Sequence, residues 1–321
     1  MRNQLPKQQR GVALITAVLI VALVTAAAVA MASRQQLDIR RSANIFNNDI
    51  AYQFALGAED FARNMLEWDA DPKKGNPKVD HLGEDWAQKA PPMVVEGAVL
   101  SGSIQDLQGR INLNALLKAD GTRNQEMMKR FERLLRLLDL NQEIAEAVID
   151  WVDNEGVEPT GVGGAEDDYY MLQTPPYRTP HGMIASSSEL LLVKGVDYEA
   201  YQLLLPHVSA LPDRETKINV NTASAEVLAS LAENLAITNG EALIDARPKD
   251  GFDKISSFTV ELNRLGNDNG YLEDFLDVQS SYFLVDAMAE FDESIAQLHS
   301  LVHRNNTTAG VRVVMRSRGA Y

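Results

Sequence analysis

From Gly11 to Ser33 the chain carries no charged residue, with Arg10 the last charge before this run and Arg34 the first after it. An α-helix rises about 1.5 Å per residue, so the run is long enough to cross the roughly 30 Å hydrocarbon core of a bilayer. Beyond Arg34, apolar residues recur at spacings of three and four as far as Trp68, which is the pattern of an amphipathic helix. These positions include Ile39, Phe46, Ile50, Phe54 and Phe61. We expect one long helix that begins in a membrane and ends as the spine of a soluble domain.

The start of the chain resembles the class III signal of type IV pilins and type II secretion pseudopilins. A short leader with basic residues ends in Gly11, and the apolar run follows directly. In that family a dedicated peptidase cuts after the glycine, and the new N-terminal residue is methylated. The resemblance implies a leader peptide at residues 1–11, cleavage between Gly11 and Val12, and a transmembrane segment at residues 12–33. The family normally has Glu five residues into the mature chain, where this sequence has Thr16. That departure is typical of the K-type minor pseudopilins.

Two other interpretations of this segment stay open at this level. A cleaved secretory signal fits the small residues at positions 28–32, although the apolar run is longer than usual and the amphipathic pattern follows it without a break. A plain single-pass anchor fits the same residues equally well. Flanking charges do not decide the orientation, because basic residues lie on both sides of the run and a long domain is translocated largely regardless of charge.

Composition restricts the function of this 321-residue chain. A net charge of −15 argues against nucleic acid or anionic lipid as the main partner and suits divalent cations or a basic protein surface. The absence of cysteine excludes disulfides and thiol chemistry. The five histidines are scattered without metal-ligand spacing, and no Gly-x-Ser-x-Gly sequence is present. We therefore predict that the protein is not an enzyme.

Strand patterns occur on both sides of a helical middle. They cover residues 93–107, 280–291, 295–302 and 311–315. Strands joined by short connections indicate an antiparallel sheet. We predict an α+β fold in which the long N-terminal helix packs on a small antiparallel sheet. Residues 34–108 and 271–321 would form this domain, and residues 109–270 an inserted all-α domain.

The predicted insertion contains an internal repeat. Ile111-Asn112-Leu113-Asn114 returns as Ile218-Asn219-Val220-Asn221. In each copy we expect the second Asn to cap a helix, because its side-chain oxygen accepts a hydrogen bond from an unpaired backbone amide. The insertion is thus predicted to hold two related units, roughly residues 109–211 and 218–266.

The second unit resembles the helix-hairpin-helix family, whose members often open with Asn-x-Asn-Thr-Ala. That family binds DNA phosphates through the backbone of a Gly-x-Gly hairpin with basic flanks. Here the hairpin region at residues 235–240 has the single Gly240, and acidic residues accompany the basic ones around it. Two helix-hairpin-helix-like units without DNA binding are the favoured interpretation. A membrane-tethered periplasmic DNA receptor is the alternative.

Acidic residues are concentrated between positions 150 and 168, where Glu155 and Glu158 lie among glycines. The residues that we predict to bind a metal are Asp150, Asp153, Glu166, Asp167 and Asp168. Hard divalent cations take six to eight oxygen ligands from flexible loops. The spacing is not that of an EF-hand, and a solvated acidic loop is the competing interpretation. K-type pseudopilins bind calcium, and the resemblance of this stretch to theirs implies a calcium site.

The combination of start, helix, sheet and insertion resembles the K-type minor pseudopilins of type II secretion systems. The resemblance implies a single-pass inner-membrane protein with most of its chain in the periplasm. It would sit at the pseudopilus tip and nucleate or cap assembly for the export of folded proteins across the outer membrane. The implied partners are the I and J types, then the H type and the major pseudopilin, together with prepilin peptidase but not nucleic acid. The helix face with Ile39, Phe46, Ile50, Phe54 and Phe61 would bind the other pseudopilins.

Overall fold

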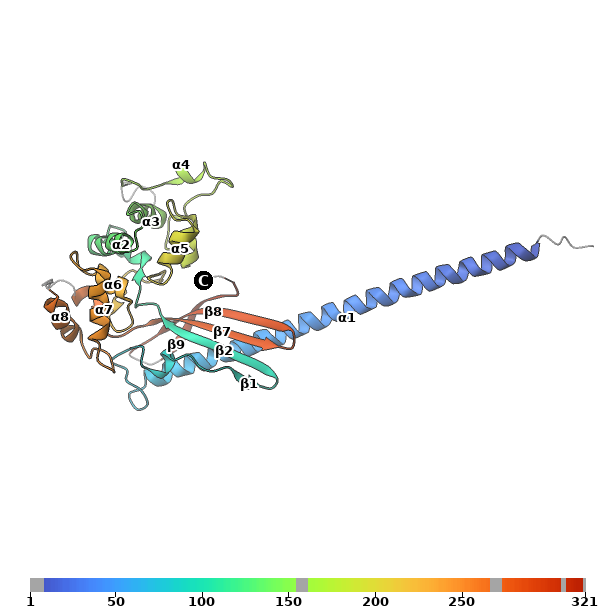
Figure 1. Ribbon diagram of the computed structural model, residues 1–321, viewed down its shortest axis with the longest axis horizontal. Coiled ribbons are helices and arrows are strands. Elements are labelled where there is room, and N and C mark those ends of the chain that lie inside the picture. The colour runs from blue at the N-terminus through green and yellow to red at the C-terminus, as the bar shows by residue number, and fades with distance from the viewer. Residues whose placement is uncertain (1–8, 154–160, 266–272, 307–309, 320–321) are drawn as a thin grey trace, which may run out of the picture.

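The structure is a computed structural model that describes residues 9–153, 161–265, 273–306 and 310–319. Its longest element is α1 (Gln9–Asp69), and the N-terminal half of this helix extends away from the rest of the molecule (Figure 1). The prediction of one continuous helix is confirmed. Residues 1–8 of the predicted leader lie outside the described residues, as do Glu155 and Glu158 of the acidic stretch.

An antiparallel sheet of five strands lies along the C-terminal half of α1, in the order β1-β2-β7-β8-β9 (Figure 1). The strands are β1 (Met93–Val95), β2 (Ala98–Asp106), β7 (Tyr282–Phe291), β8 (Ser294–Arg304) and β9 (Val311–Ser317). Strand β2 pairs with β7 from Ala98 opposite Phe291 to Asp106 opposite Phe283. This pairing joins strands from the two ends of the chain, so the predicted α+β arrangement is confirmed.

The face of α1 that touches the sheet carries mainly small side chains. Ala51 and Ala55 are fully buried, which lets the helix axis lie close to the strands. The buried Glu59 receives hydrogen bonds from Arg316 Nε and Nη2, at 2.7 and 2.8 Å, and from the Ser300 hydroxyl. Burial alone raises the pKa of Glu59, but these donors lower it below its ordinary value. One charged contact therefore fixes how α1 is seated on the sheet.

The chain between β2 and β7 forms a helical block at the far end of the sheet from the projecting half of α1 (Figure 1). Its helices are α2 (Gln125–Leu137), α3 (Ile144–Val152), α4 (Asp167–Tyr170), α5 (Tyr198–Leu204), α6 (Ala225–Ser230), α7 (Ile237–Asp245) and α8 (Ile255–Arg264). They enclose a hydrophobic core separate from the one between α1 and the sheet.

Two parallel ladders of two residues each also lie in this block, which differs in this respect from the all-α expectation. Strand β3 (Ile111–Asn112) pairs with β4 (Val208–Ser209), and β5 (Ile218–Asn219) pairs with β6 (Leu276–Asp277). Each ladder joins the start of one repeat unit to the chain that returns from it. A two-residue strand has no detectable alternation, so the sequence pattern could not reveal it.

The second Asn of each repeat binds both the amide and the carbonyl of one distant residue. Asn114 accepts from the amide of Ile184 at 2.8 Å and donates to its carbonyl at 2.9 Å. Asn221 does the same with Phe252, at 2.7 and 3.1 Å. The two units are therefore built on one plan, in which a buried Asn fixes a distant loop against the start of the unit.

The prediction that this second Asn caps a helix is wrong. The first Asn of the first copy, Asn112, is the N-cap of the 3₁₀ turn Leu113–Leu116, and Ser224 caps α6. Both copies of the motif are fully buried. A buried Asn side chain needs hydrogen-bond partners for both its NH₂ group and its oxygen. The carbonyl and the amide of one distant residue supply both partners, whereas a helix N-terminus would supply only an amide.

Candidate functional site

The first described turns of α1 carry the features expected of a membrane segment. Among the described residues, α1 is the helix long and apolar enough to cross a membrane, and its most apolar window is not buried in the molecule. A Cβ atom at Gly11 would meet no described atom within 4 Å beyond its own helix turn. The fold itself therefore places no steric demand for glycine at this position.

Thr16 satisfies its own polar group inside α1. Its hydroxyl lies 3.1 Å from the carbonyl oxygen of Val12 and 3.0 Å from that of Ala13. Such back-bonding is how a hydroxyl is accommodated in a helix without another partner. Position 16 thus offers a neighbouring chain neither a carboxylate nor a free hydroxyl proton.

The helix face predicted to bind partners is partly exposed. Ile39 and Phe46 are exposed on the free part of α1, whereas Ile50 and Phe54 are half-buried at the edge of the sheet. Phe61 keeps 47% of its surface exposed. Along this edge runs an apolar groove of about 350 Å³, lined by Phe54, Phe61, Trp86 and Leu100 among others. The apolar stripe therefore continues past the membrane segment into a groove beside the sheet.

The structure brings together some of the predicted metal ligands. Asp150 and Asp153, at the end of α3, are both fully buried. Ligand atoms of Asp153 and Glu166 lie within 4.8 Å of each other and of a ring nitrogen of His181. One ion can bridge groups at such a separation.

Among the predicted ligands, Asp150 has the surroundings that most favour a bound cation. Neither of its carboxylate oxygens accepts a hydrogen bond of standard geometry from a described residue. Burial raises the pKa of Asp150 to about 7; Glu166 and Asp153 raise it as well, whereas the Ala165 amide lowers it. A buried carboxylate that accepts no hydrogen bond of standard geometry is costly, and a bound cation removes that cost. The carboxylates gathered here are therefore of the kind that can hold a divalent ion.

The other two predicted ligands have different surroundings. Asp167 accepts hydrogen bonds from the amide and hydroxyl of Thr179, at 3.0 and 3.1 Å, and its carboxylate lies 3.4 Å from Arg178. Asp168 is exposed and accepts from the amide of Tyr169 at 2.8 Å. His181, one of the five histidines whose spacing showed no metal-ligand pattern, joins the group instead. Its partners are distant in sequence, so the spacing of the histidines held no signal for it.

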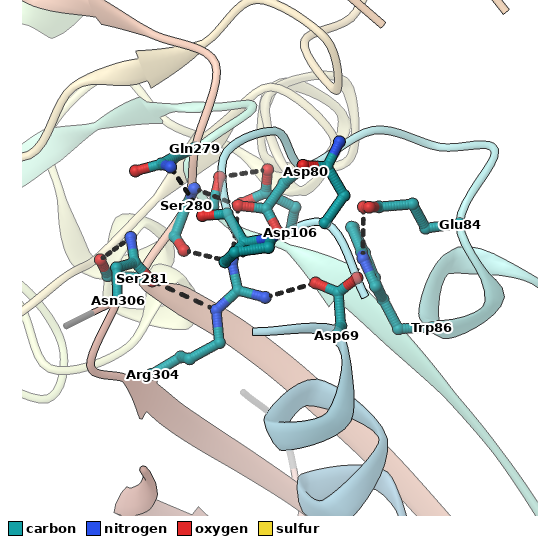
Figure 2. A network of polar contacts seen from close by, with 12 residues as sticks. Asp69, Asp80, Glu84, Trp86, Asp106, Gln279, Ser280, Ser281, Arg304 and Asn306 are labelled. Atoms are coloured by element: carbon teal, nitrogen blue, oxygen red, sulfur yellow. Dashed lines mark hydrogen bonds and ion pairs between the residues drawn. The ribbon is translucent and has the colours of Figure 1, made fainter. Parts of the chain in front are cut away.

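A second group of buried charges joins α1, the sheet and the helical block (Figure 2). Arg304 of β8 is 2% exposed and donates to Asp69 at 2.7 Å, to both oxygens of Asp80 at 2.5 and 2.6 Å, and to the Ser280 carbonyl at 2.9 Å. Burial lowers the pKa of Arg304, but Asp80 and Asp69 more than offset this, so its pKa lies above the ordinary value. The guanidinium is therefore charged, and it is hydrogen-bonded to Asp69, Asp80 and the Ser280 carbonyl.

Asp106, the last residue of β2, extends this group into the second repeat unit. Its carboxylate accepts from the hydroxyls of Ser280 and Thr222, each at 2.6 Å, and from the Asn219 amide at 3.1 Å. Nearby, burial raises the pKa of Glu84 to about 8, and the charges of Asp69 and Asp80 raise it too, despite hydrogen bonds from the His81 amide and the Trp86 indole. The junction between sheet and helical block is thus polar, buried and closely bonded.

Comparison with known proteins gives a consistent result. Family models described as "Type II secretion system (T2SS), protein K" match residues 109–213 and 218–279. Type II secretion system protein K of Pseudomonas aeruginosa is 38% identical over 97% of this chain and 93% of its own length. Protein K of Klebsiella pneumoniae is 32% identical over 98% of both chains. The chain belongs to the type II secretion system protein K family.

A solved structure agrees on the fold of this protein K chain. A chain in the crystal structure of the GspK–GspI–GspJ complex from enterotoxigenic Escherichia coli superposes with a TM-score of 0.77 at 24% identity. The match covers 88% of this chain and 100% of that one.

Membership of the protein K family makes the chain a minor pseudopilin, which is a structural component and not an enzyme. The same result leaves the DNA-receptor alternative without support. The family is an envelope component, and the apolar start of α1 fits membrane anchoring.

Proposed function

We propose that this protein K chain is the tip subunit of a periplasmic pseudopilus and is anchored in the inner membrane by residues 12–33 before assembly. The observation that carries the proposal is Thr16 with its hydroxyl bonded back to its own helix. In pilin-type assemblies, the Glu at this position is thought to neutralise the N-terminal amine of the subunit above. An unpaired charge inside a membrane is costly, so this pairing selects where each subunit enters.

A subunit without this carboxylate cannot neutralise the N-terminal amine of a subunit above it. Its own amine, at Val12 after processing, still receives the Glu of a subunit below. The chemistry of position 16 therefore permits only the top place. The helical block supports the same conclusion, because it stands out from the line of α1 at the far end of the sheet (Figure 1), where it would obstruct another subunit in a shaft.

Cysteine crosslinking between copies tests the tip position cleanly, because the chain has no native cysteine. The parent with single cysteines at the exposed positions Ile39 and Phe46 should give no crosslink between copies. Combining Thr16→Glu with excision of residues 109–279 should produce one, since both obstacles are then removed. Leu107 N lies 3.1 Å from Tyr282 O, so a short linker closes the gap.

Thr16→Gln with the same excision is the matched control, because Gln has the shape of Glu without its charge and should not restore the crosslink. If the Glu variant also fails to enter a shaft, the tip argument loses its physical basis.

We propose the I and J types as direct partners, with the H type and the major pseudopilin below them. The support is the relative solved in a GspK–GspI–GspJ complex and the exposed apolar stripe of α1. Ile39 and Phe46 on the free helix, and Phe61 beside the groove, are the residues through which we expect this packing.

Processing by prepilin peptidase between Gly11 and Val12, followed by methylation of Val12, is part of the proposal. Gly11→Val should leave the full-length precursor, because nothing in the fold requires glycine there and the requirement belongs to the peptidase. Gly57→Val is a matched control on the same helix, where a Cβ also meets no atom within 4 Å, and it should be processed normally. Intact-mass analysis of membrane-extracted protein checks this result. An N-terminus at Ser33 in the parent, or an uncleaved Met1, contradicts it.

We also propose that Asp150, Asp153 and Glu166, with Asp167 and Asp168 as further candidates, bind calcium. The support is that the buried Asp150 carboxylate accepts no hydrogen bond of standard geometry, and that ligand atoms of Asp153 and Glu166 lie within 4.8 Å of each other. Calcium would supply the positive charge that holds the end of α3 and the loop before α4 together. The chain itself provides carboxylate oxygens that already lie close together.

Chelator should lower the melting temperature of the full-length protein, since a ligand at about a hundred times its Kd stabilises the native state by about 2.7 kcal/mol. Asp153→Ala should remove this response to calcium. Asp150→Asn should also remove it, yet leave the chelated protein at least as stable as the parent, because a buried like charge is gone. Asp168→Ala should keep the response, since its carboxylate is exposed. Equal melting of the parent with chelator and with calcium supports the solvated loop instead.

A further inference from the structure

The segment between α1 and β1 reaches both hydrophobic cores of the molecule, and we call its residues 79–88 the strap. Val79 is buried in the core of the helical block, whereas Trp86 is buried in the core between α1 and the sheet. The strap is also bound to the block through its backbone, because the Asn219 amide group donates to the Asp80 carbonyl at 3.1 Å. The polar residues between Val79 and Trp86 therefore lie where the two cores meet.

This junction holds more acidic groups than basic ones (Figure 2). Four carboxyl groups accompany the guanidinium of Arg304, and they belong to Asp69 of α1, Asp80 and Glu84 of the strap, and Asp106 of β2. Arg304 donates to Asp69 and to Asp80, and Asp106 accepts from neutral hydroxyl and amide groups. Glu84 accepts from the backbone and from an indole, both neutral. One guanidinium cannot balance four ionised carboxylates in a buried place.

Glu84 and Asp69 approach each other closely. Carboxylate oxygens of Asp69, Asp80 and Glu84 lie within 4.8 Å of one another, and the side chains of Asp69 and Glu84 are in hydrogen-bond contact. Two ionised carboxylates cannot form a hydrogen bond, because each can only accept, whereas a protonated carboxyl group donates. The Asp69 and Glu84 side chains are only 13% and 10% exposed, so water screens their repulsion poorly.

We propose that Glu84 and Asp69 hold one proton between them at neutral pH, and that loss of this proton at alkaline pH releases the strap and loosens the helical block from the sheet. The proton lies mainly on Glu84, because Arg304 stabilises Asp69 as an anion at 2.7 Å. Since the two groups interact strongly, the titration belongs to the pair. The inference rests on the fold and not on the functions proposed above.

The other charged groups around the pair do not replace this proton. His81 Nε2 lies 4.0 Å from Glu84 Oε1, but burial lowers the pKa of the His81 ring, although Asp250 and Asp69 raise it, so the ring is neutral at alkaline pH. Asp250, in the loop before α8, adds a negative charge from the helical block. Asp80 and Asp106 add theirs from the strap and from β2, and Arg304 of β8 already binds two carboxylates.

The direction of the pH effect follows from the pKa values of the pair. Burial raises the pKa of Glu84 from its ordinary value of 4.5 to about 8, and burial likewise raises that of Asp69 although Arg304 lowers it. The folded protein thus binds the proton more tightly than the unfolded chain does. The stability that the proton contributes is therefore complete below the ordinary value and is lost as the pH rises toward about 8.

Urea unfolding of the full-length protein in detergent tests the proposal. Between about pH 5 and about pH 8, the unfolding equilibrium constant of the parent should rise at least about tenfold more than that of Glu84→Gln. Glutamine still accepts from the His81 amide and the Trp86 indole, and it donates to Asp69 as the protonated acid does. The variant should therefore match the parent at the lower pH and be more stable at the higher. Glu290→Gln, at an exposed position of β7, is the matched control and should follow the parent throughout.

Hydrogen exchange shows whether the strap itself is released. The Asp80 amide donates to the Val278 carbonyl at 2.8 Å, which ties the strap to the chain that enters β7. Compared at the same pH of about 8, this amide should exchange at least about tenfold faster in the parent than in Glu84→Gln. Equal exchange in the two proteins refutes the release of the strap.

Infrared spectroscopy of the parent detects the proton without any substitution. The stretching band of a protonated carboxyl group should persist at about pH 7, where exposed carboxylates are ionised, and should disappear above the pKa of Glu84. The band should be weaker in Glu84→Gln and unchanged in Glu290→Gln. If the parent has no such band, or if Glu84→Gln depends on pH as the parent does, the pair holds no proton and the proposal is overturned.

Discussion

Replacing Arg304 with leucine is expected to lower the free energy of unfolding by about 3–5 kcal/mol, the usual cost of removing one partner from a buried ion pair. Asp80, which is 1% exposed, and Asp69 would lose the guanidinium that binds them both. Burial already raises the pKa of both carboxyls, that of Asp80 to about 7, so without Arg304 each would be left either as an uncompensated buried charge or with a bound proton. The hydrogen bond to the Ser280 carbonyl at the start of β7 would be lost as well. Because this junction carries the second repeat unit, the loss should loosen the helical block relative to the sheet (Figure 2).

Urea unfolding of the full-length protein in detergent measures this effect, with hydrogen exchange at β7 and β8 as the local readout. Arg304→Lys should recover only part of the loss, because an ammonium lacks the planar fork that binds two carboxylates at once. Arg264→Leu is the surface control: its pair with Glu261 is 72% exposed on the arginine side, and such pairs contribute at most about 1 kcal/mol. A cost for Arg304→Leu no larger than that of Arg264→Leu means that the junction is not held by charge.

Sequence patterns that repeat every few residues were enough to predict most of the architecture. The uncharged run and the apolar spacing after it predicted α1 as one helix, and the two clusters of strand patterns predicted a sheet that draws on both ends of the chain. These features depend on neighbours a few residues apart, which a sequence displays directly. Asp150, Asp153 and Glu166 could be proposed as metal ligands for the same reason, since carboxylates crowded in a short stretch are visible without a structure.

Features that depend on distant partners were missed. A carboxylate in an amphipathic helix is normally expected to face solvent, yet Glu59 is fully buried because Arg316 and Ser300 approach it from the other end of the chain. His181 likewise has a ring nitrogen within 4.8 Å of ligand atoms of Asp153 and Glu166, which lie outside its own loop. Each contact appears only when the chain is folded, and no spacing rule anticipates it.

Gly240 has a structural role different from the one that its local sequence suggests. In the sequence it is the single glycine of a hairpin region that lacks the second glycine of a phosphate cradle. In the structure it lies inside α7, where glycine costs about 1 kcal/mol relative to alanine. A close backbone contact that leaves no room for a side chain therefore explains the glycine at this position. That contact is with Ala225, the first residue of α6.

Gly240→Ala is accordingly expected to lower the free energy of unfolding by about 3 kcal/mol, at the upper end of the cost of overpacking. Its Cβ would lie 2.7 Å from the carbonyl carbon of Ala225 and 2.9 Å from its Cα, with the carbonyl oxygen nearer still. Backbone atoms cannot swing aside as a side chain does, so α6 and α7 must separate. Gly57→Ala in α1 makes the same chemical change where a Cβ meets nothing within 4 Å, and it should stabilise by up to about 1 kcal/mol. Both variants gain the same helix propensity, so the difference between them in urea unfolding isolates the contact with Ala225. A Gly240→Ala protein as stable as the parent, with unchanged hydrogen exchange in α6 and α7, would show that the two helices are not packed this closely.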